Sequence, residues 1–171
     1  MTLLALLQAA LPAGVAAAVA SEYEVKAAFV YNFTRFVQWP RSRASGPLDI
    51  CVIGEDPFGS AIDEAVENKR VGGREITVKR LSEIEKAKAC EVLFIASSED
   101  EEVERIVETL AGVPVLTVGD TEDFAERGGM INLTKQGSHV RFEINVDALE
   151  RAGLRASSQL LRLATIVGET R

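Results

Sequence analysis

Four apolar, strand-length runs alternate with helical patterns between residues 48 and 126, and this alternation limits the possible folds more than any other feature. The runs at 48–54 and 91–96 are almost continuously apolar, which is typical of strands buried on both faces. Strands that alternate with helices predict a parallel sheet with right-handed crossovers. The expected strands are 48–54, 75–81, 91–96 and 114–118, and the expected helices are 56–68, one from 82, 98–110 and 121–126.

The pattern changes after residue 130. Short apolar runs at 130–133 and 139–145 flank a turn-rich stretch, and the second run alternates strictly, which predicts an antiparallel hairpin. Two further helices are expected at 147–153 and 157–167. The predicted fold class is therefore α/β and Rossmann-like, with a mostly parallel sheet flanked by helices and an antiparallel C-terminal hairpin at one edge.

A helix rich in aromatic residues is predicted between Ser21 and Pro40. This stretch holds three of the seven Phe, both Tyr and the only Trp. Ser21 and Glu24 have the spacing of a capping box, and Pro40 disfavours helical geometry at Trp39, so both ends of the helix are expected to be marked by sequence.

The apolar residues of this helix cover more than one of its sides, and two roles remain open for them. Most are expected to pack in the core, which is the commoner fate of such residues. Tyr31, Arg35 and Trp39 are the candidate interface with a protein partner or with a second copy of the chain.

Residues 1–20 carry no charged side chain, and Ala18, Val19 and Ala20 match the small-x-small form of a secretory cleavage site. The expected organisation is a signal peptide at 1–20 followed by a single domain at 21–171, so the mature protein is expected to be exported. An uncleaved anchor helix is the alternative, although Pro12 and Gly14 make this stretch a poor membrane span.

The chain of 171 residues is long enough for one domain with its own core. Its 19 basic and 26 acidic residues give a formal charge of -7, and its basic residues are scattered. This charge argues against nucleic acid as a partner and against direct binding to anionic membranes after signal cleavage.

Cys51 and Cys90 are the only cysteines. After export to an oxidising compartment they form the only possible intramolecular pair, and we favour a disulfide between them over two reduced core thiols. In a sheet of order 2-1-3-4 the first and third strands are neighbours, which brings both cysteines within reach of each other.

The sequence offers little for catalysis. Glu55 and Asp56 would repel a phosphate where a nucleotide-binding loop would lie, and the third strand ends in Ser97, where a phospho-acceptor domain needs an Asp. His139 is the only histidine, so a multi-histidine metal site is excluded and a Ser138–His139 hydrolase is a distant third hypothesis. No enzymatic activity, cofactor or metal is expected.

A small-ligand-binding module is the alternative to a protein-binding function. Ligands of open α/β sheets bind at the carboxyl ends of the strands. A pocket would there be formed by Asp56, Ser97 and Asp120, which follow the first, third and fourth predicted strands.

Several stretches together resemble the YfiR-like family of exported bacterial proteins, over roughly residues 22–167. They are YEVKAAFVYNFTRFVQWP at 23–40, CVIGEDPFG at 51–59, PVLTVGD at 114–120, FAERGGMINL at 124–133, VRFEIN at 140–145 and AGLRASSQLLRLA at 152–164.

The resemblance implies a periplasmic α/β protein, often dimeric. The family's named member represses a membrane diguanylate cyclase by binding its periplasmic domain, which restrains cyclic-di-GMP production and biofilm formation. That member carries a second disulfide, whereas this chain has only Cys51 and Cys90, so only the first bridge carries over. The expected function is therefore regulatory binding.

Overall fold

The computed structural model describes residues 13–43 and 45–168. Its strands are β1 (Val37–Gln38), β2 (Leu48–Ile53), β3 (Arg70–Val71), β4 (Arg74–Leu81), β5 (Val92–Ile95), β6 (Leu116–Gly119), β7 (Ile131–Gln136), β8 (His139–Asn145), β9 (Arg155–Ala156) and β10 (Thr165–Val167). Its helices are α1 (Ala13–Phe36), α2 (Ala61–Val66), α3 (Val103–Thr109), α4 (Val146–Arg151) and α5 (Ser158–Leu161), with 3-10 helices η1 (Arg41–Arg43), η2 (Ile84–Ala89) and η3 (Ser97–Glu102).

An eight-stranded sheet with the order β10-β8-β7-β6-β5-β2-β4-β3 forms the centre of the fold. The strands β4, β2, β5, β6 and β7 run parallel, and their order confirms the predicted 2-1-3-4 arrangement. β7 and β8 pair antiparallel, with Leu133 opposite Phe142, as the alternation of the second run predicted. The α/β fold class expected from the sequence is confirmed.

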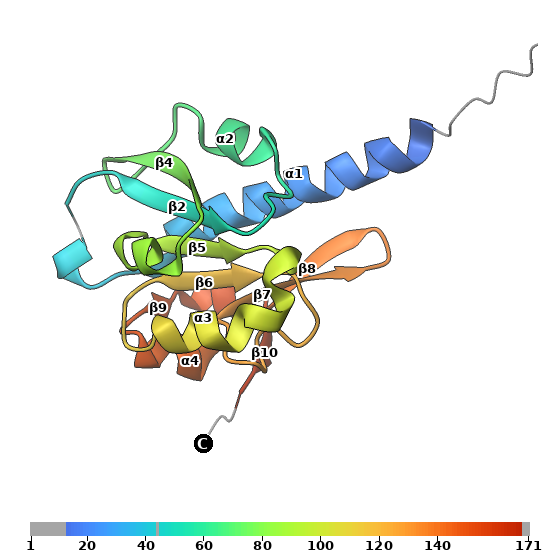
Figure 1. Ribbon diagram of the computed structural model, residues 1–171. Helices are drawn as coiled ribbons and strands as arrows, with labels where there is room; N and C mark the ends of the chain where they lie inside the picture. The colour runs from blue at the N-terminus through green and yellow to red at the C-terminus, as the bar shows by residue number, and fades with distance from the viewer. Residues whose placement is uncertain (1–12, 44, 169–171) are drawn as a thin grey trace, which may run out of the picture.

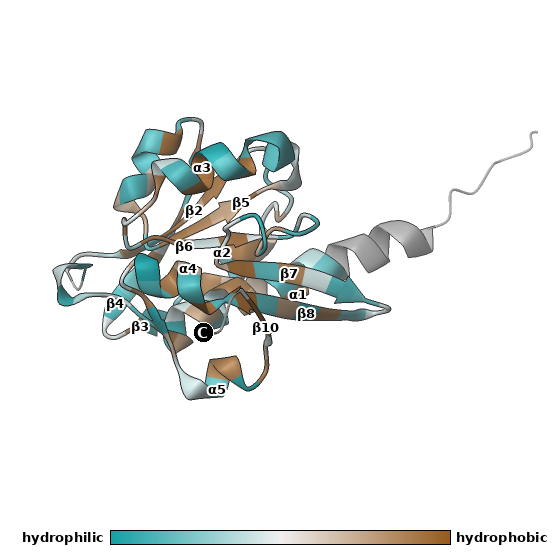
Figure 2. Ribbon diagram, turned by 90° about the horizontal axis from the view of Figure 1, so that it is seen from below, coloured by the Kyte–Doolittle hydropathy of each residue, from teal (hydrophilic) through white to brown (hydrophobic). Residues whose placement is uncertain are grey.

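Side chains of the parallel strands alternate between two hydrophobic clusters on opposite faces of the sheet. Val52 packs in one cluster with Phe33 of α1, and Ile53 packs in the other with Ile106 of α3. Figure 1 shows α1 and α3 on opposite sides of the sheet. Figure 2 shows hydrophobic residues along β2 and β5 and hydrophilic residues on the outer side of α3. The sheet is thus covered on both faces, as its continuously apolar strands require.

The aromatic helix is longer at its start and shorter at its end than predicted. It begins at Ala13, so Ser21 and Glu24 lie inside α1 and not at its cap. The alanine-rich stretch before Ser21 has high helix propensity, which lets the helix continue upstream. It ends at Phe36, because Val37 and Gln38 pair with β9. Residues 1–12 of the expected signal peptide lie outside the described residues.

The helix predicted at 56–68 is reduced to α2. Asp56 Oδ1 accepts a hydrogen bond from the Phe58 N–H at 2.8 Å, and Asp56 Oδ2 accepts one from Arg80 Nε at 2.9 Å. Asp56 therefore closes a turn and does not cap a helix. The regions predicted as helices from 82 and 98 begin as the 3-10 helices η2 and η3.

Residues 121–126 form turns where a short helix was predicted. Asp123 has a φ of 55°, in the left-handed region, which interrupts a helix. The ring of Phe124 fills the space beside Gly119 and Gly129, where an added Cβ would lie 2.6 and 2.2 Å from ring atoms. A side chain at either position would clash with the buried Phe124 ring, so both positions require glycine.

The C-terminal helix predicted at 157–167 is a single turn, α5, followed by β10. Thr165, Ile166 and Val167 are β-branched, which favours a strand, and they pair parallel with β8. The antiparallel hairpin is therefore followed at this edge by one three-residue strand. α4 begins one residue earlier than predicted, with Asn145 Oδ1 accepting from the Ala148 N–H at 2.9 Å.

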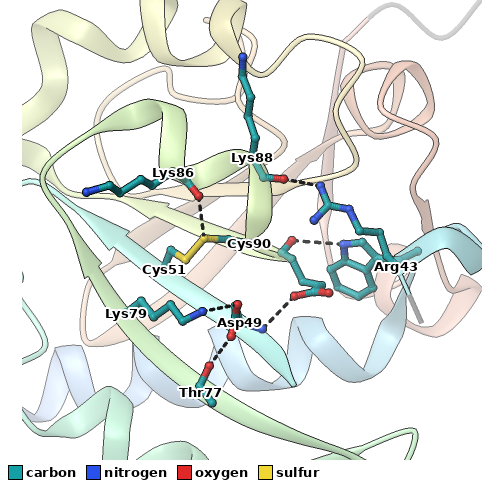
Figure 3. The surroundings of a disulfide bond; sticks show 10 residues. Arg43, Asp49, Cys51, Thr77, Lys79, Lys86, Lys88 and Cys90 are labelled. Atoms are coloured by element: carbon teal, nitrogen blue, oxygen red, sulfur yellow. Dashed lines mark hydrogen bonds and ion pairs between the residues drawn. A yellow bond between two sulfur atoms is a disulfide. The ribbon is translucent and has the colours of Figure 1, made fainter. Parts of the chain in front are cut away.

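The predicted disulfide is present between Cys51 in β2 and Cys90, which precedes β5 (Figure 3). Their Cα atoms are 6.2 Å apart, and both residues are buried. The bridge closes a loop of 39 residues and links two neighbouring parallel strands on the face covered by α3. In the chain-entropy model such a loop stabilises the fold by about 4 kcal/mol.

The double substitution Cys51→Ala and Cys90→Ala is therefore expected to lower the free energy of unfolding by about 3 to 4 kcal/mol. Urea unfolding of the mature chain measures the change. Wild-type protein unfolded in the presence of a reductant serves as the control and should match the variant. An unchanged unfolding midpoint would contradict the role given to this bridge.

Candidate functional site

The carboxyl end of β6 is closed by α1 through a buried carboxylate, Asp120. Tyr23 Oη donates a hydrogen bond to Asp120 Oδ2 at 2.9 Å, and Lys26 Nζ lies 2.8 Å from the same oxygen. Lys26 also pairs with Glu22 Oε1 at 2.7 Å, and Glu22 in turn pairs with Lys135 of β7. The Asp120 side chain is only 3% exposed, so this ion pair fastens α1 to the sheet away from water.

The surroundings of the Lys26–Asp120 ion pair shift the pKa values of Tyr23, Lys26 and Glu22. Burial and the negative charge of Asp120 raise the pKa of Tyr23 to about 12. Burial disfavours a charged Lys26, but its hydrogen bonds to Asp120 and Glu22 outweigh burial and raise the pKa of Lys26. Hydrogen bonds from Lys135 and Lys26 lower the pKa of Glu22. At neutral pH the cluster therefore holds a neutral Tyr23 phenol and a charged Lys26 ammonium group.

The three residues of the predicted ligand pocket lie at the strand ends, but each has its own surroundings. Asp56 is paired with Arg80 and lines a depression that includes Tyr23 and Phe58. Asp120 lines a different depression. Ser97 is exposed at the start of η3.

The crevice between the ends of β2 and β5, where doubly wound sheets usually bind ligands, is filled by protein. The Glu55 N–H donates to Ser98 Oγ at 2.8 Å across this point. Gly54 has a φ of 91°, and a Cβ added there would lie 2.5 Å from Ser98 Oγ. The backbone of the loop after β2 is therefore in direct contact with the side chain of Ser98 in η3, which occupies this point.

The candidate interface residues of α1 differ in their exposure. Arg35 is exposed, and its Cζ lies 5.9 Å from the centroid of the half-buried Tyr31 ring. Lys69 Nζ lies 4.3 Å from the same ring. Trp39 is half-buried and donates from Nε1 to the Glu91 carbonyl at 3.2 Å. Tyr31 and Arg35 thus form a cation–π contact at the surface, and Trp39 is held against the start of β5.

Glu91 is a structural residue that the sequence analysis did not single out. Its side chain is 5% exposed, and its Oε2 accepts from the Asp49 N–H at 2.8 Å while Oε1 pairs with Arg74 at 2.5 Å. Figure 3 shows the neighbouring polar contacts of Asp49 with Thr77 and Lys79. A charged residue at the start of an apolar strand was the only hint of this network in the sequence.

A family model described as YfiR/HmsC-like matches residues 23–165. The chain belongs to the YfiR/HmsC-like family. The match starts at Tyr23, the first residue that α1 contributes to the Asp120 contact, and ends at the first residue of β10. It therefore includes the whole sheet apart from the last two residues of β10. It also includes the candidate interface residues of α1 and the three residues of the predicted ligand pocket.

Two solved structures share the fold at low sequence identity. A conserved domain protein from Vibrio cholerae O1 biovar El Tor has a TM-score of 0.52 and 13% identity over 70% of this chain and 54% of its own. An ABC domain from Streptococcus pneumonia, solved in complex with L-Trp, has a TM-score of 0.51 and 7% identity over 70% of this chain and 55% of its own. The chain thus spans about half the length of each of these two proteins.

Within residues 13–43 and 45–168, no helix is both long and apolar enough to cross a membrane. In the same residues, no group of three or more His, Cys, Asp or Glu side chains is arranged to hold a metal ion.

Replacing Lys26 with Met is expected to lower the free energy of unfolding by about 3 kcal/mol, because the substitution leaves the Asp120 carboxylate buried without its cation. Chemical denaturation measures the loss. The double variant Lys26→Met with Asp120→Leu removes both charges and should recover most of the stability. A double variant no more stable than Lys26→Met would show that the pair is not coupled in this way.

The raised pKa of Tyr23 makes the free energy of unfolding depend on pH in the alkaline range. Its folded pKa of about 12 exceeds the ordinary value of 10.0, so its contribution is complete below pH 10.0 and is lost as the pH rises from there to about 12. The difference in unfolding free energy between wild type and Tyr23→Phe should therefore shrink over this interval. Denaturation curves recorded at several alkaline pH values test this, and a constant difference would contradict it.

Proposed function

We propose that the protein is an exported regulatory binding protein that represses a membrane-bound diguanylate cyclase by binding the cyclase's periplasmic domain. Membership of the YfiR/HmsC-like family over residues 23–165 is the observation that carries the proposal. Binding would hold the cyclase in an inactive state and lower cyclic-di-GMP. The chain acts by occupying a surface and carries out no chemistry in this account.

The location in the periplasm is part of the proposal. The disulfide between Cys51 and Cys90 is of the kind that persists in oxidising compartments. Cleavage after Ala20 would leave Tyr23, Lys26 and Phe33, and with them the described contacts of α1 with the sheet. The mature chain therefore keeps the contacts of Tyr23 and Lys26 with Asp120 when the signal peptide is removed.

The surface we propose for the partner is the outer face of α1, centred on Tyr31 and Arg35 and bordered by Trp39. Tyr, Trp and Arg supply most of the binding energy in protein interfaces. Tyr31 lies between Arg35 and Lys69, which limits its rotamers before binding and so lowers the entropy lost on association. A second copy of the chain could use the same face to form a homodimer.

Binding of a small ligand is the second candidate function. It is favoured by one specific observation, which is a set of buried oxygen atoms around Asp120 that have no hydrogen-bond partner among the described residues. The two functions concern different surfaces of α1, so they can be tested separately.

The substitution Arg35→Glu is expected to weaken binding of the mature chain to the periplasmic domain of its cyclase by at least about tenfold, which corresponds to about 1.4 kcal/mol. Arg105→Glu is the matched control, because it makes the same charge change at an exposed position of α3 on the opposite face of the sheet. Biolayer interferometry measures both.

Two results would contradict different parts of this account. The absence of a complex with wild-type protein, together with unchanged cyclic-di-GMP after gene deletion, would overturn the proposed function. Equal affinities of Arg35→Glu and Arg105→Glu would leave the function in place and remove the proposed surface.

A further inference from the structure

A polar depression of about 360 Å³ lies beside α1 at the carboxyl ends of β6 and the start of β7. Three of its lining side chains present buried oxygens that have no hydrogen-bond partner among the described residues. They are Asp120 Oδ1, Thr121 Oγ1 and Asn132 Oδ1. The depression is separate from the outer face of α1 that we propose for the protein partner.

Two of these oxygens, those of Asp120 and Asn132, are held in place by hydrogen bonds made by the other polar atom of the same side chain. Asp120 Oδ2 is fixed by Tyr23 and Lys26, so Oδ1 cannot turn toward the same partners. Asn132 donates from Nδ2 to Glu143 Oε2 at 3.1 Å, and this bond determines which way its Oδ1 points. Asn132 is 3% exposed and Thr121 9% exposed, so neither reaches bulk water easily.

Leaving such groups without partners is costly. A buried donor or acceptor that makes no hydrogen bond destabilises a protein by about 1–3 kcal/mol. Native proteins therefore pair nearly all of them, and an exception calls for an explanation. Asp120 and Thr121 are adjacent in sequence, and Asn132 pairs in the sheet with Gly119, the residue before Asp120. Three exceptions that line one depression indicate a preformed binding site.

The chemistry of the ligand follows from the free atoms and from the charge around them. The carboxylate and amide oxygens only accept hydrogen bonds, so the ligand must donate. On the lining of the depression, carboxylates outnumber ammonium groups by five to two, which favours a cation. A ligand of this volume is small, at the lower end of the usual range for pockets.

A primary ammonium group fits these requirements better than a divalent metal ion does. It carries three N–H donors, as many as there are free oxygens, and a single charge. Calcium needs six to eight oxygen ligands, and the ammonium of Lys26 on Asp120 would repel its double charge more strongly. The side chains of the described residues also form no metal-binding group of His, Cys, Asp or Glu.

We propose that this depression binds the ammonium head group of a small primary amine through Asp120, Thr121 and Asn132. The amine donates to the three free oxygens, and its alkyl part extends toward solvent. This site does not depend on the proposed cyclase partner, so the failure of one proposal leaves the other standing.

Isothermal titration and thermal unfolding of the mature chain with propylammonium test the proposal. Propyltrimethylammonium is the matched control ligand, because it has the same charge and chain but no N–H donor. Saturable binding of propylammonium, with a rise in unfolding temperature that follows mass action, is expected, and the control ligand should bind at least tenfold more weakly. Equal behaviour of the two ligands, no binding, or stabilisation by calcium chloride alone would overturn the proposal.

Thr121→Val is the informative variant, because it removes one free oxygen while keeping the shape of the side chain. It should weaken propylammonium binding at least tenfold while leaving the ligand-free protein as stable as wild type or more stable. Thr117→Val is the control, since Thr117 Oγ1 already accepts from the Met130 N–H at 3.1 Å and faces a different depression. It should lose stability and keep amine binding. Unchanged binding by Thr121→Val would contradict the site.

Discussion

The docking of α1 across the sheet is the constraint on which the remaining structure depends. Its apolar contacts centre on Phe33, whose ring centroid lies 5.3 Å from that of Phe142 in β8. Its polar contact is the buried pair of Lys26 with Asp120, which has a strict geometry because both charges are removed from water. The apolar contacts supply the hydrophobic stabilisation, and the ion pair fixes where along the sheet the helix lies. Together they cover one face of the sheet and close the carboxyl end of β6.

This docking divides α1 into surfaces with different uses. Tyr23 and Lys26 face the strand ends, Phe33 faces the core, and Arg35 remains exposed. One helix thus contributes to the core, to the polar depression around Asp120 and to the surface proposed for a partner. At the ends of β2 and β5, Gly54 and the Glu55 N–H pack directly against the side chain of Ser98.

Features that depend on local pattern were predictable from the sequence, and features that depend on distant partners were not. The strands and their parallel arrangement follow from continuous apolar runs that alternate with helices. The bridge between Cys51 and Cys90 was predictable because they are the only two cysteines of a chain expected to be exported. The role of Asp120 does not, because its partner Tyr23 is 97 residues away in sequence. Helix ends were predicted poorly for the same reason, since Asp56 is engaged by Arg80 of β4 and not by the helix that follows it.

Native-state hydrogen exchange of the backbone amides in α1 tests the central claim most directly. If the docking of α1 holds the fold together, the amides from Lys26 to Phe33 should exchange only through global unfolding, with the same free energy and denaturant dependence as those of β2 and β5. Exchange of these α1 amides through a separate opening of lower free energy, with the sheet still protected, would contradict this account.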